Sequence, residues 1–339
     1  MKTKKLPVKP PRIPAHLGLD LAKDKFDAAV FTAEGAVHHQ VFEHTRNGLA
    51  ALRRWCQQLH LDIQGVVMEA TGLYFELPAE TLRRAGWHVF VVNPAQAKRF
   101  MESLLQRGKN DRLDAEALAR LCAGHRIFGL HEWTPPPPER RELLALSRAR
   151  TALVFQRAAL RQQANDAPCP IAATAFAQAA DALDRQVRKL EQALRKLVAA
   201  HAELARQIAL LESIPGIGFV TACVLLAELC HLPANAGRRA LSAYAGLCPA
   251  QQQSGHKAGR TTLSKTGNAR LRAALYLPAL CALRTIPAYA AFALRLKARG
   301  LKPMQAVAAI MRKLLLLAGS LLRSGLAYQA QPATTLAHA

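Results

Sequence analysis

Residues 16–128 alternate between short apolar stretches and amphipathic ones, and the order of these stretches restricts the folds open to the chain. Three apolar stretches separated by short turns come first and predict a meander of strands: HLGLDLA, KFDAAVFT and AVHHQVFE. A helix over 46–60, the strand IQGVVMEA, a helix over about 73–85, the strand WHVFVV and further helices follow. The predicted order is therefore β-β-β-α-β-α-β-α.

This order of elements is the one found in ribonuclease-H-like folds, of the kind seen in Holliday-junction resolvases, where crossovers extend a meander into a mixed α/β sheet. In such a sheet the first strand lies beside the fourth. Asp20, midway along the first, would then lie next to Glu69 at the end of the fourth. Burial of a carboxylate is unfavourable unless a cation pairs with it. Two simpler alternatives remain: Asp20 faces solvent by strand alternation, and Glu69 caps the helix that follows.

Two further acids, Asp111 and Asp114, stand three residues apart in KNDRLDAEALAR, a stretch of good helix formers. Carboxylates at i and i+3 share a helix face and repel each other. Either Asn110 or Asp111 caps this helix and Asp114 sits in its first turn, where the helix dipole favours acids, or a cation offsets the repulsion. Together with Asp20 and Glu69 they would form a tetrad able to hold two Mg²⁺ or Mn²⁺ ions about 3.5–4 Å apart on a phosphodiester.

The charge of the chain predicts a polyanionic partner. The formal net charge is +23 and the pI is about 10.4, far more basic than solubility requires. All 23 acidic residues lie at or before Glu228, whereas the last 111 residues carry 15 Lys and Arg and no acid. A magnesium-type site can therefore be assembled only from the first two thirds of the chain, and the last third is suited to binding phosphate. We expect nucleic acid as the partner.

The sequence argues against a zinc site, secretion and a membrane location. Seven scattered cysteines without C-x-x-C spacing predict buried thiols in a reducing cytoplasm. The basic, proline-rich start MKTKKLPVKPPRIP predicts a flexible arm over 1–15 instead of a signal peptide. The apolar segment MQAVAAIMRKLLLLAGSLLR is interrupted by Arg312 and Lys313, which predicts a packed helix. We expect a cytoplasmic, nucleoid-associated protein with no membrane contact.

The residues beyond a proline-rich linker over 129–138 predict helices. A helical segment over 139–212 would contain helices at about 139–165 and 175–212. Apolar residues spaced by four and three predict a coiled-coil seam, in which His201 would set the register. The apolar seam residues are Leu183, Val187, Leu190, Leu194, Leu197, Leu204, Ile208 and Leu211. The seam predicts contact between subunits, and a helical hairpin within one chain is the alternative.

A helical domain over 213–326 and a tail over 327–339 complete the predicted organisation. The domain opens with SIPGIG, whose Gly216 and Gly218 would lie between two helices and offer backbone N–H groups to a phosphate. A plain glycine turn between helices fits the same residues. The polar loop that follows in this domain is rich in hydrogen-bond donors.

Taken together, these stretches resemble the DEDD transposases of the IS110 insertion-sequence group, to which pilin-gene DNA invertases also belong. In the first half GLDLAKDKFDAAV, VVMEATGLY and KNDRLDAEALA resemble the stretches that carry that family's four acids. In the second half SIPGIGFVTACVLLAEL, LSAYAGLCPAQQQSG and SKTGNARLRAAL resemble its second domain. The resemblance implies an insertion-sequence transposase or site-specific DNA recombinase. It assigns the metal-ligand role to Asp20, Glu69, Asp111 and Asp114.

The resemblance also implies a serine nucleophile, which by its position in QQQSG is Ser254, with Ser264 and Ser242 as competing candidates. Its hydroxyl would attack DNA and hold it as a phosphoserine, together with the acidic site of another subunit in a dimer or tetramer. A structured guide RNA encoded by the element would choose donor and target DNA. The residues expected to contact backbone phosphates, or else to form a solvated basic face, are Lys257, Arg260, Lys265, Arg270 and Arg272, with Asn268 orienting the loop.

Two other functions remain open from the residues alone. A junction-resolving nuclease would use only the four acids and water, would release free DNA ends and would not depend on any C-terminal serine. A non-catalytic architectural DNA- or RNA-binding protein would show strongly salt-dependent binding that does not require magnesium.

Overall fold

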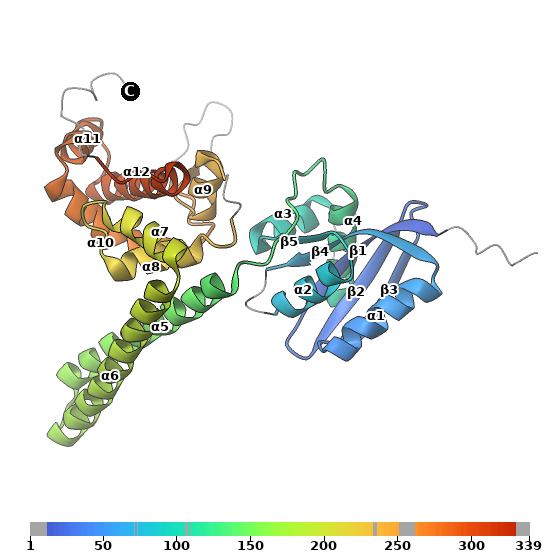
Figure 1. Ribbon diagram of the computed structural model, residues 1–339, viewed down its shortest axis with the longest axis horizontal. Helices are drawn as coiled ribbons and strands as arrows, with labels where there is room; N and C mark the ends of the chain where they lie inside the picture. Colours follow the sequence, from blue (N-terminus) through green and yellow to red (C-terminus); the bar gives the residue numbers. More distant parts are fainter. Residues whose placement is uncertain are drawn as a thin grey trace, which may run out of the picture. The chain divides into compact units, whose positions relative to one another are not determined.

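The computed structural model describes residues 12–70, 72, 74–105, 108, 110–232, 236–250 and 262–329. They belong to two compact units that divide between Pro135 and Pro136 (Figure 1). The first unit is a mixed α/β structure, and the second is helical apart from one pair of very short strands. The prediction of a mixed sheet followed by a helical region is therefore confirmed.

The sheet of the first unit has five strands in the order β3-β2-β1-β4-β5. Its strands are β1 (Ile13–Leu21), β2 (Lys25–Thr32), β3 (Val37–Glu43), β4 (Leu61–Glu69) and β5 (Val89–Val92). The first three pair antiparallel as the predicted meander, whereas β1, β4 and β5 pair in parallel. β1 thus lies in the middle of the sheet, between β2 and β4.

The sheet starts earlier in the chain than predicted. β1 begins at Ile13, and Ala15 is fully buried, so these residues are not part of the arm expected over 1–15. The difference arises because prolines on both sides of Ile13 gave the segment the composition of a flexible arm. The backbone N–H of Ile13 nevertheless donates a hydrogen bond to the His60 carbonyl.

Four helices cover the sheet: α1 (Arg46–Gln58), α2 (Glu76–Arg84), α3 (Pro94–Ser103) and α4 (Asp111–Ala123). Polar side chains start three of them, because Thr45, Asn93 and Asn110 each accept a hydrogen bond from a backbone N–H of the first turn. α1 and α2 pack on one face with Leu17 and Leu19 of β1. α4 lies against the other face, together with α3, in a separate hydrophobic cluster.

The backbone of α4 comes into direct contact with β1 at Gly18. A Cβ atom at this position would lie 2.2 Å from the Ala115 carbonyl oxygen and 2.3 Å from the Ala119 nitrogen. Such distances are far inside van der Waals contact, so only glycine fits between strand and helix. The contact fixes the first turn of α4 next to the end of β1.

The second unit consists of eight helices and the strand pair β6 (Pro249–Ala250) and β7 (Thr262–Leu263), among the residues that the structure describes. The helices are α5 (Pro138–Asp166), α6 (Pro170–Ala200), α7 (Ala202–Glu212), α8 (Phe219–Glu228), α9 (Arg238–Tyr244), α10 (Ala269–Thr285), α11 (Pro287–Ala298) and α12 (Pro303–Ser324). One hydrophobic core joins the ends of α5 and α6 to α7, α8 and the later helices.

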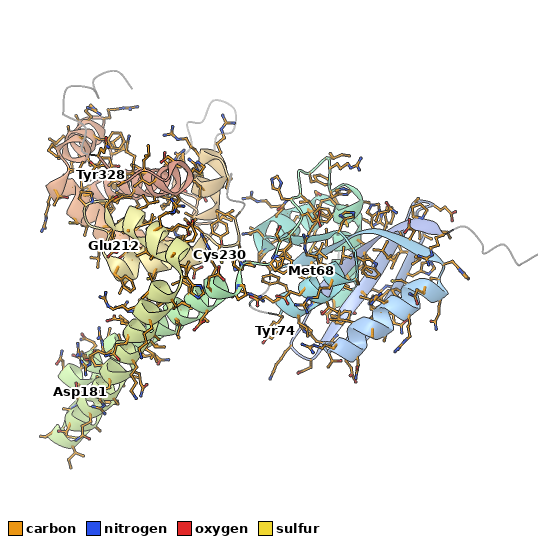
Figure 2. The ribbon with its side chains drawn as sticks, in the orientation of Figure 1. Met68, Tyr74, Asp181, Glu212, Cys230 and Tyr328 are labelled. Atoms are coloured by element: carbon orange, nitrogen blue, oxygen red, sulfur yellow. The ribbon has the colours of Figure 1, made fainter. Side chains whose placement is uncertain are left out.

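α5 and α6 form a helical hairpin within the chain (Figure 1). Val187, Leu194 and Leu197 of the predicted seam are buried inside the unit. Arg150 pairs with Glu191 at 2.8 Å between the two helices, whereas Asp181 lies on the outer surface of α6 (Figure 2). The hairpin accounts for this part of the apolar seam without a second subunit, and contact between subunits remains a prediction.

The single helix predicted over 175–212 is wrong at one point, because it is divided at His201. This residue has φ −126° and ψ 102°, ends α6 and precedes α7. Its side chain is exposed, so it does not set the register of a buried seam. The apolar spacing continues through the break, which is why the sequence pattern does not reveal it.

Two further expectations concern apolar helices and thiols. By length and composition α12 could cross a membrane, and so could α10 and α11 if their bent pair were one span. Ile310, Leu314 and Leu315 of α12 are nevertheless fully buried in the core, in agreement with a packed helix. The seven cysteines are free thiols, but Cys169 and Cys281 are exposed instead of buried.

We predict that Gly18→Ala lowers the free energy of unfolding of the first unit by about 2 kcal/mol or more, since the methyl group would overlap the α4 backbone. Thermal unfolding followed by circular dichroism measures the change. Gly108→Ala is the matched control, because its Cβ would meet only Leu113 Cδ1 at 3.7 Å. Wild-type stability of Gly18→Ala would show that α4 is not held against β1 in this way.

Candidate functional site

The four acids expected to form a tetrad come from three elements of the first unit. Asp20 lies near the end of β1, and Glu69 is the last residue of the parallel strand β4. The register pairs Leu19 with Met68, which brings the next residues of the two strands side by side. Asp111 and Asp114 occupy the first turn of α4, which begins after the Asn110 cap.

Asp20 lies on the face of β1 that α4 covers. Leu17, Leu19 and Leu21 point into the core beneath α1 and α2, so strand alternation turns Gly18 and Asp20 to the opposite face. Asp20 is half-buried there, so the solvent-facing alternative does not describe it. Gly18 and Asp20 therefore face α4 for the same reason, namely the alternation of side chains between the two faces of β1.

The acids are close enough to change the protonation of Asp20. Burial and then the neighbouring carboxylates of Asp114, Asp111, Glu69 and Asp27 raise the pKa of Asp20 from 3.8 to about 6. Each neighbour acts in the same direction, because a nearby negative charge disfavours ionisation of another acid. The structure thus brings together the four predicted residues and adds a fifth carboxylate.

Asp27 was not predicted as a site residue. The β1–β2 register places it directly opposite Asp20, and its side chain is almost fully buried. It accepts a hydrogen bond from Lys25 Nζ at 3.2 Å and contacts His39 Nε2 at 2.7 Å. Pairing the first two apolar stretches as a hairpin would have revealed the Asp20–Asp27 pair in the sequence.

Lys25 is the cation that joins this group. Its Nζ lies 2.8 Å from the Asp111 carboxylate as well as 3.2 Å from Asp27. Hydrogen bonds to Asp111 and then Asp27 raise the pKa of Lys25. The ammonium therefore links β2 to the first turn of α4 and neutralises part of the negative charge.

The donor set suits a hard divalent cation, because it consists of carboxylate oxygens. Within the part of the chain that the structure describes, no three His, Cys, Asp or Glu side chains are already arranged around one point. Holding an ion would therefore require the carboxylates to move closer together. The backbone positions of the four acids are set by β1, β4 and α4.

The glycine-rich stretch predicted between helices connects α7 to α8. Gly216 adopts φ +90°, a left-handed conformation that favours glycine, and a Cβ there would lie 2.9 Å from the Cys281 Cβ. Gly218 precedes the first residue of α8, and both glycines are exposed. The turn is present where expected, and its contact with a phosphate remains a prediction.

Glu228, the last acid of the chain, is buried and fully engaged. It accepts hydrogen bonds from Arg148 Nε at 2.8 Å, Arg148 Nη2 at 3.0 Å and Asn268 Nδ2 at 2.7 Å. Burial raises the pKa of Glu228, but these hydrogen bonds outweigh burial and hold it below its ordinary value. The Asn268 side chain also accepts from the backbone nitrogens of Arg270 and Leu271, so the network fixes the start of α10.

Three predicted site residues lie outside the described residues, namely Ser254, Lys257 and Arg260. The other candidates flank that gap. Ser264 is partly exposed and its Oγ accepts a hydrogen bond from Thr266 N at 3.2 Å, whereas Ser242 is fully buried beneath Arg312. Burial removes Ser242 from the candidate nucleophiles.

The remaining basic candidates differ in exposure. Lys265 and Arg270 are exposed. Arg272 is half-buried, and its Nη1 donates to the carbonyls of Ala245 at 3.0 Å and Gly267 at 3.2 Å. Arg272 therefore has a structural role that the sequence did not indicate, and its contact with phosphate stays a prediction.

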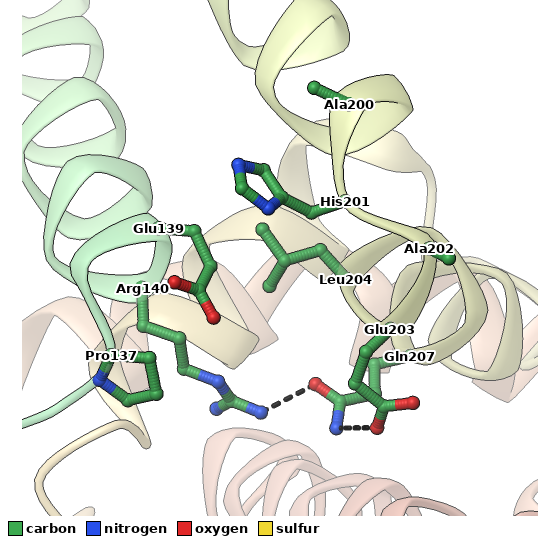
Figure 3. Close-up of a pocket in the computed structure, with 9 residues that line it drawn as sticks. All are labelled: Pro137, Glu139, Arg140, Ala200, His201, Ala202, Glu203, Leu204 and Gln207. Atoms are coloured by element: carbon green, nitrogen blue, oxygen red, sulfur yellow. Dashed lines mark hydrogen bonds between the residues drawn. The ribbon is translucent and has the colours of Figure 1, made fainter.

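A hollow of about 450 Å³ lies where α5 begins and α6 gives way to α7 (Figure 3). Arg140 reaches from α5 to the Gln207 Oε1 at 2.5 Å, and Gln207 donates to Glu203 at 2.5 Å. Burial lowers the pKa of Arg140. These contacts connect the base of the hairpin to α7, and none of the predicted site residues lines the hollow.

Comparisons with known proteins identify two matching family models. Residues 17–167 match the model of a DEDD transposase domain of IS110, and residues 208–293 match a model described as transposase IS116/IS110/IS902 family. The two matches cover the acidic cluster, the α7–α8 turn and the segment from α9 to α10.

Full-length relatives are also found. The chain is 29% identical over 321 residues to the pilin gene-inverting proteins of Moraxella bovis and Moraxella lacunata, covering 91% of this chain and 95% of each relative. It is 27% identical over 299 residues to the transposase for insertion sequence element IS1111A of Coxiella burnetii, covering 80% of this chain and 78% of that protein. The chain belongs to the IS110 family of transposases, a family of DNA-cutting and rejoining enzymes.

Proposed function

We propose that this transposase cuts and rejoins DNA with a metal-dependent site built from Asp20, Glu69, Asp111 and Asp114, and with Ser254 as the nucleophile. The observation that carries the proposal is the convergence of the four acids. They come from β1, β4 and α4, and Asp114, Asp111 and Glu69 all raise the pKa of the half-buried Asp20. Acids far apart in the sequence rarely gather without a cation or a catalytic role to favour it.

The strand order supports a ribonuclease-H-like catalytic unit. An antiparallel meander extended by two parallel strands, in the order β3-β2-β1-β4-β5, is the arrangement inferred from the sequence for such a fold. We assign this unit to 13–128, the helical segment to 139–212 and the serine-bearing domain to 213–326. A coiled coil between subunits would use surfaces of α5 and α6 that the hairpin leaves exposed.

The acidic residues would hold two Mg²⁺ or Mn²⁺ ions. When bound, such ions activate the attacking oxygen at a phosphodiester and neutralise the charge of the leaving oxygen. Asp20, Glu69, Asp111 and Asp114 provide the oxygen ligands, and Lys25 and Asp27 hold the neighbouring charge in place. The raised pKa of Asp20 is consistent with a site in which the carboxylates repel each other and a bound cation would reduce that repulsion.

Ser254 needs acidic residues from another part of the protein to be activated. A serine hydroxyl is a weak nucleophile until a base or a metal removes its proton. No acid follows Glu228 in the sequence, and Glu228 is already bound to Arg148 and Asn268. We therefore propose that Ser254 works with the carboxylates of a first unit, supplied by another subunit of a dimer or tetramer.

In this scheme the Ser254 oxygen forms a bond to phosphorus as the bond to the leaving strand breaks. The hydroxyl proton passes to a base, and the leaving oxygen takes up a proton. The reverse attack by another strand end would rejoin the DNA and release the serine. Backbone phosphates would be bound by the glycine turn at 216–218 and by basic residues near Ser254. These residues are Lys257, Arg260, Lys265 and Arg270, together with the region of Asn268.

The partners proposed are donor and target DNA and a structured guide RNA, in the cytoplasm of a prokaryotic cell. The net charge of +23 supports a polyanionic partner of either kind. A metal-dependent nuclease that uses water is the second candidate, because the acidic cluster is assembled from the first unit alone.

We predict that Asp111→Asn and Ser254→Ala each reduce DNA recombination by at least about 100-fold, for different reasons. Asp111→Asn removes a metal ligand, whereas Ser254→Ala removes the group that becomes bonded to DNA. Recombination on a plasmid carrying the element, together with denaturing gels for a covalent protein–DNA adduct, measures both effects. Both variants should lack the adduct, because the serine attack needs the metal site, but Ser254→Ala leaves the four acids intact.

Ser264→Ala is the matched control, since it alters the competing serine close to the same loop. It should retain recombination and the adduct. Full joining activity of Ser254→Ala would reject the serine mechanism. Free DNA ends without an adduct, still dependent on Asp111, would favour the nuclease.

We predict that Asp20→Asn stabilises the metal-free protein at pH 7 by on the order of 1 kcal/mol after solvent screening, but not at pH 4. Because folding raises the pKa of Asp20 to about 6, ionisation disfavours the folded state, and stability is lost as the pH rises from about 4 to about 6. Asparagine cannot ionise and escapes this loss. Thermal unfolding in EDTA at the two pH values measures the difference.

Asp62→Asn is the control for removing one acid, because Asp62 is an exposed residue of β4 that pairs with Gln64. It should change stability equally little at both pH values. An Asp20→Asn protein no more stable than the wild type at pH 7 would contradict the close approach of the carboxylates.

A further inference from the structure

The second unit contains a pocket of about 510 Å³ that no described residue of the proposed site lines. It lies between α9, α11, α12 and the β6–β7 pair. We call it the basic pocket, after the four cationic side chains that line it: Arg238, Arg239, Arg312 and Lys313. Its volume is within the range of about 300–1,000 Å³ typical of pockets that enclose a drug-sized molecule. One nucleotide belongs to this size class.

The charge of the basic pocket selects an anion. None of the described residues that line it is acidic, and the sequence contains no acid after Glu228. Burial and then Arg295 and Arg238 lower the pKa of Lys313, which shows that cations are crowded together here. An anionic ligand would relieve this repulsion.

Two of the four cations are held in place by the protein. Lys313 Nζ lies 4.4 Å from the centre of the Phe292 ring, a cation–π contact between α12 and α11. Arg312 Nε donates a hydrogen bond to the buried Ser242 Oγ at 3.2 Å. Both side chains therefore need less ordering when an anion binds.

The rest of the lining is mainly apolar. Most of it is formed by Leu247, Leu263, Phe292, Leu301 and Leu316. Thr262 and Gln305 contribute polar side chains. A free phosphate would leave this apolar surface exposed to water. A nucleotide has both an anionic group for the cations and a flat base for the apolar surface, and few polar groups are present to distinguish one base from another.

The basic pocket lies close along the chain to the proposed nucleophile. Pro249 of β6 and Thr262 and Leu263 of β7 line it, and these strands flank the segment that contains Ser254. Ser254 is the fourth residue after Ala250, so the chain can span at most about 14 Å between them. A nucleotide bound in the pocket would therefore lie near the phosphate that Ser254 is proposed to attack.

We propose that the basic pocket binds one unpaired nucleotide of the DNA strand, with its phosphate on the cationic side chains and its base on the apolar surface. The choice of DNA rests on the proposed function, because the strand held near the nucleophile is the strand to be cut. The charge, size and apolar lining of the pocket do not depend on that function.

The test measures binding of a short fluorescent oligothymidylate to the full-length protein in EDTA. The double variant Arg238→Glu/Lys313→Glu should bind at least about tenfold more weakly than the wild type. The matched control is Arg284→Glu/Lys297→Glu, which makes the same charge change at exposed positions outside the pocket. The control should lose no more than about threefold, and an equal loss in both double variants would overturn the proposal.

Three further probes test the base and the sugar. A strand with abasic sites should bind the wild type about fivefold more weakly than oligothymidylate, because it lacks the base. A strand with one 5-iodouracil should crosslink to residues of the pocket, and mapping of the crosslink exclusively elsewhere would reject the site. An oligouridylate that binds through the pocket as tightly as DNA would overturn the assignment to DNA.

Failure of the pocket proposal can be distinguished from failure of the proposed serine mechanism. Binding in EDTA does not require the metal site, and Ser254→Ala should bind the oligothymidylate as the wild type does. Loss of recombination in Ser254→Ala with equal binding by the two charge variants would reject the pocket alone. Pocket-dependent binding with full joining by Ser254→Ala would reject the serine mechanism alone. Lys313→Arg keeps the positive charge and should retain binding. This variant distinguishes loss of charge from loss of folding.

Discussion

The close contact between Gly18 and α4 determines the geometry of the acidic cluster. It lets the α4 backbone lie against β1, so that the first turn of the helix meets the end of the strand. The same alternation that turns Gly18 toward α4 also turns Asp20 toward it. Asp111 and Asp114 then stand on the helix turn nearest Asp20, and the parallel pairing of β1 with β4 adds Glu69. Packing of one small residue thus brings together charges that repel each other.

The acidic cluster of the first unit and the C-terminal part of the second unit carry opposite charges, which suits a division of labour. The first concentrates carboxylates around a half-buried Asp20, with Lys25 as a neighbouring cation. The second uses its last acid, Glu228, to hold Arg148 and Asn268 together inside the fold. Its remaining C-terminal charges are all positive. Under the proposed function, acids activate the chemistry and cations hold the strand, so neither unit is sufficient alone.

The sequence predicted the order of strands and helices, a cap at either Asn110 or Asp111, of which the structure has Asn110, and the four acids that the fold brings together. It succeeded because alternation and capping are local patterns. It missed Lys25, Asp27 and His39, since their contacts depend on the register of β1, β2 and β3. The break at His201 was also missed, because side-chain spacing reports which face is apolar and contains no information on one residue's backbone angles. The roles of Arg272 and Glu228 depend on contacts between distant helices, which no local pattern encodes.

The central claim is that Asp20, Glu69, Asp111 and Asp114 bind divalent cations beside DNA. Its most direct test is anomalous diffraction at the manganese edge from crystals of the protein grown with Mn²⁺ and a DNA strand. The account predicts two manganese peaks among these four carboxylates, next to a phosphate of the strand. Manganese bound only elsewhere, or carboxylates that remain apart at saturating Mn²⁺, would contradict it.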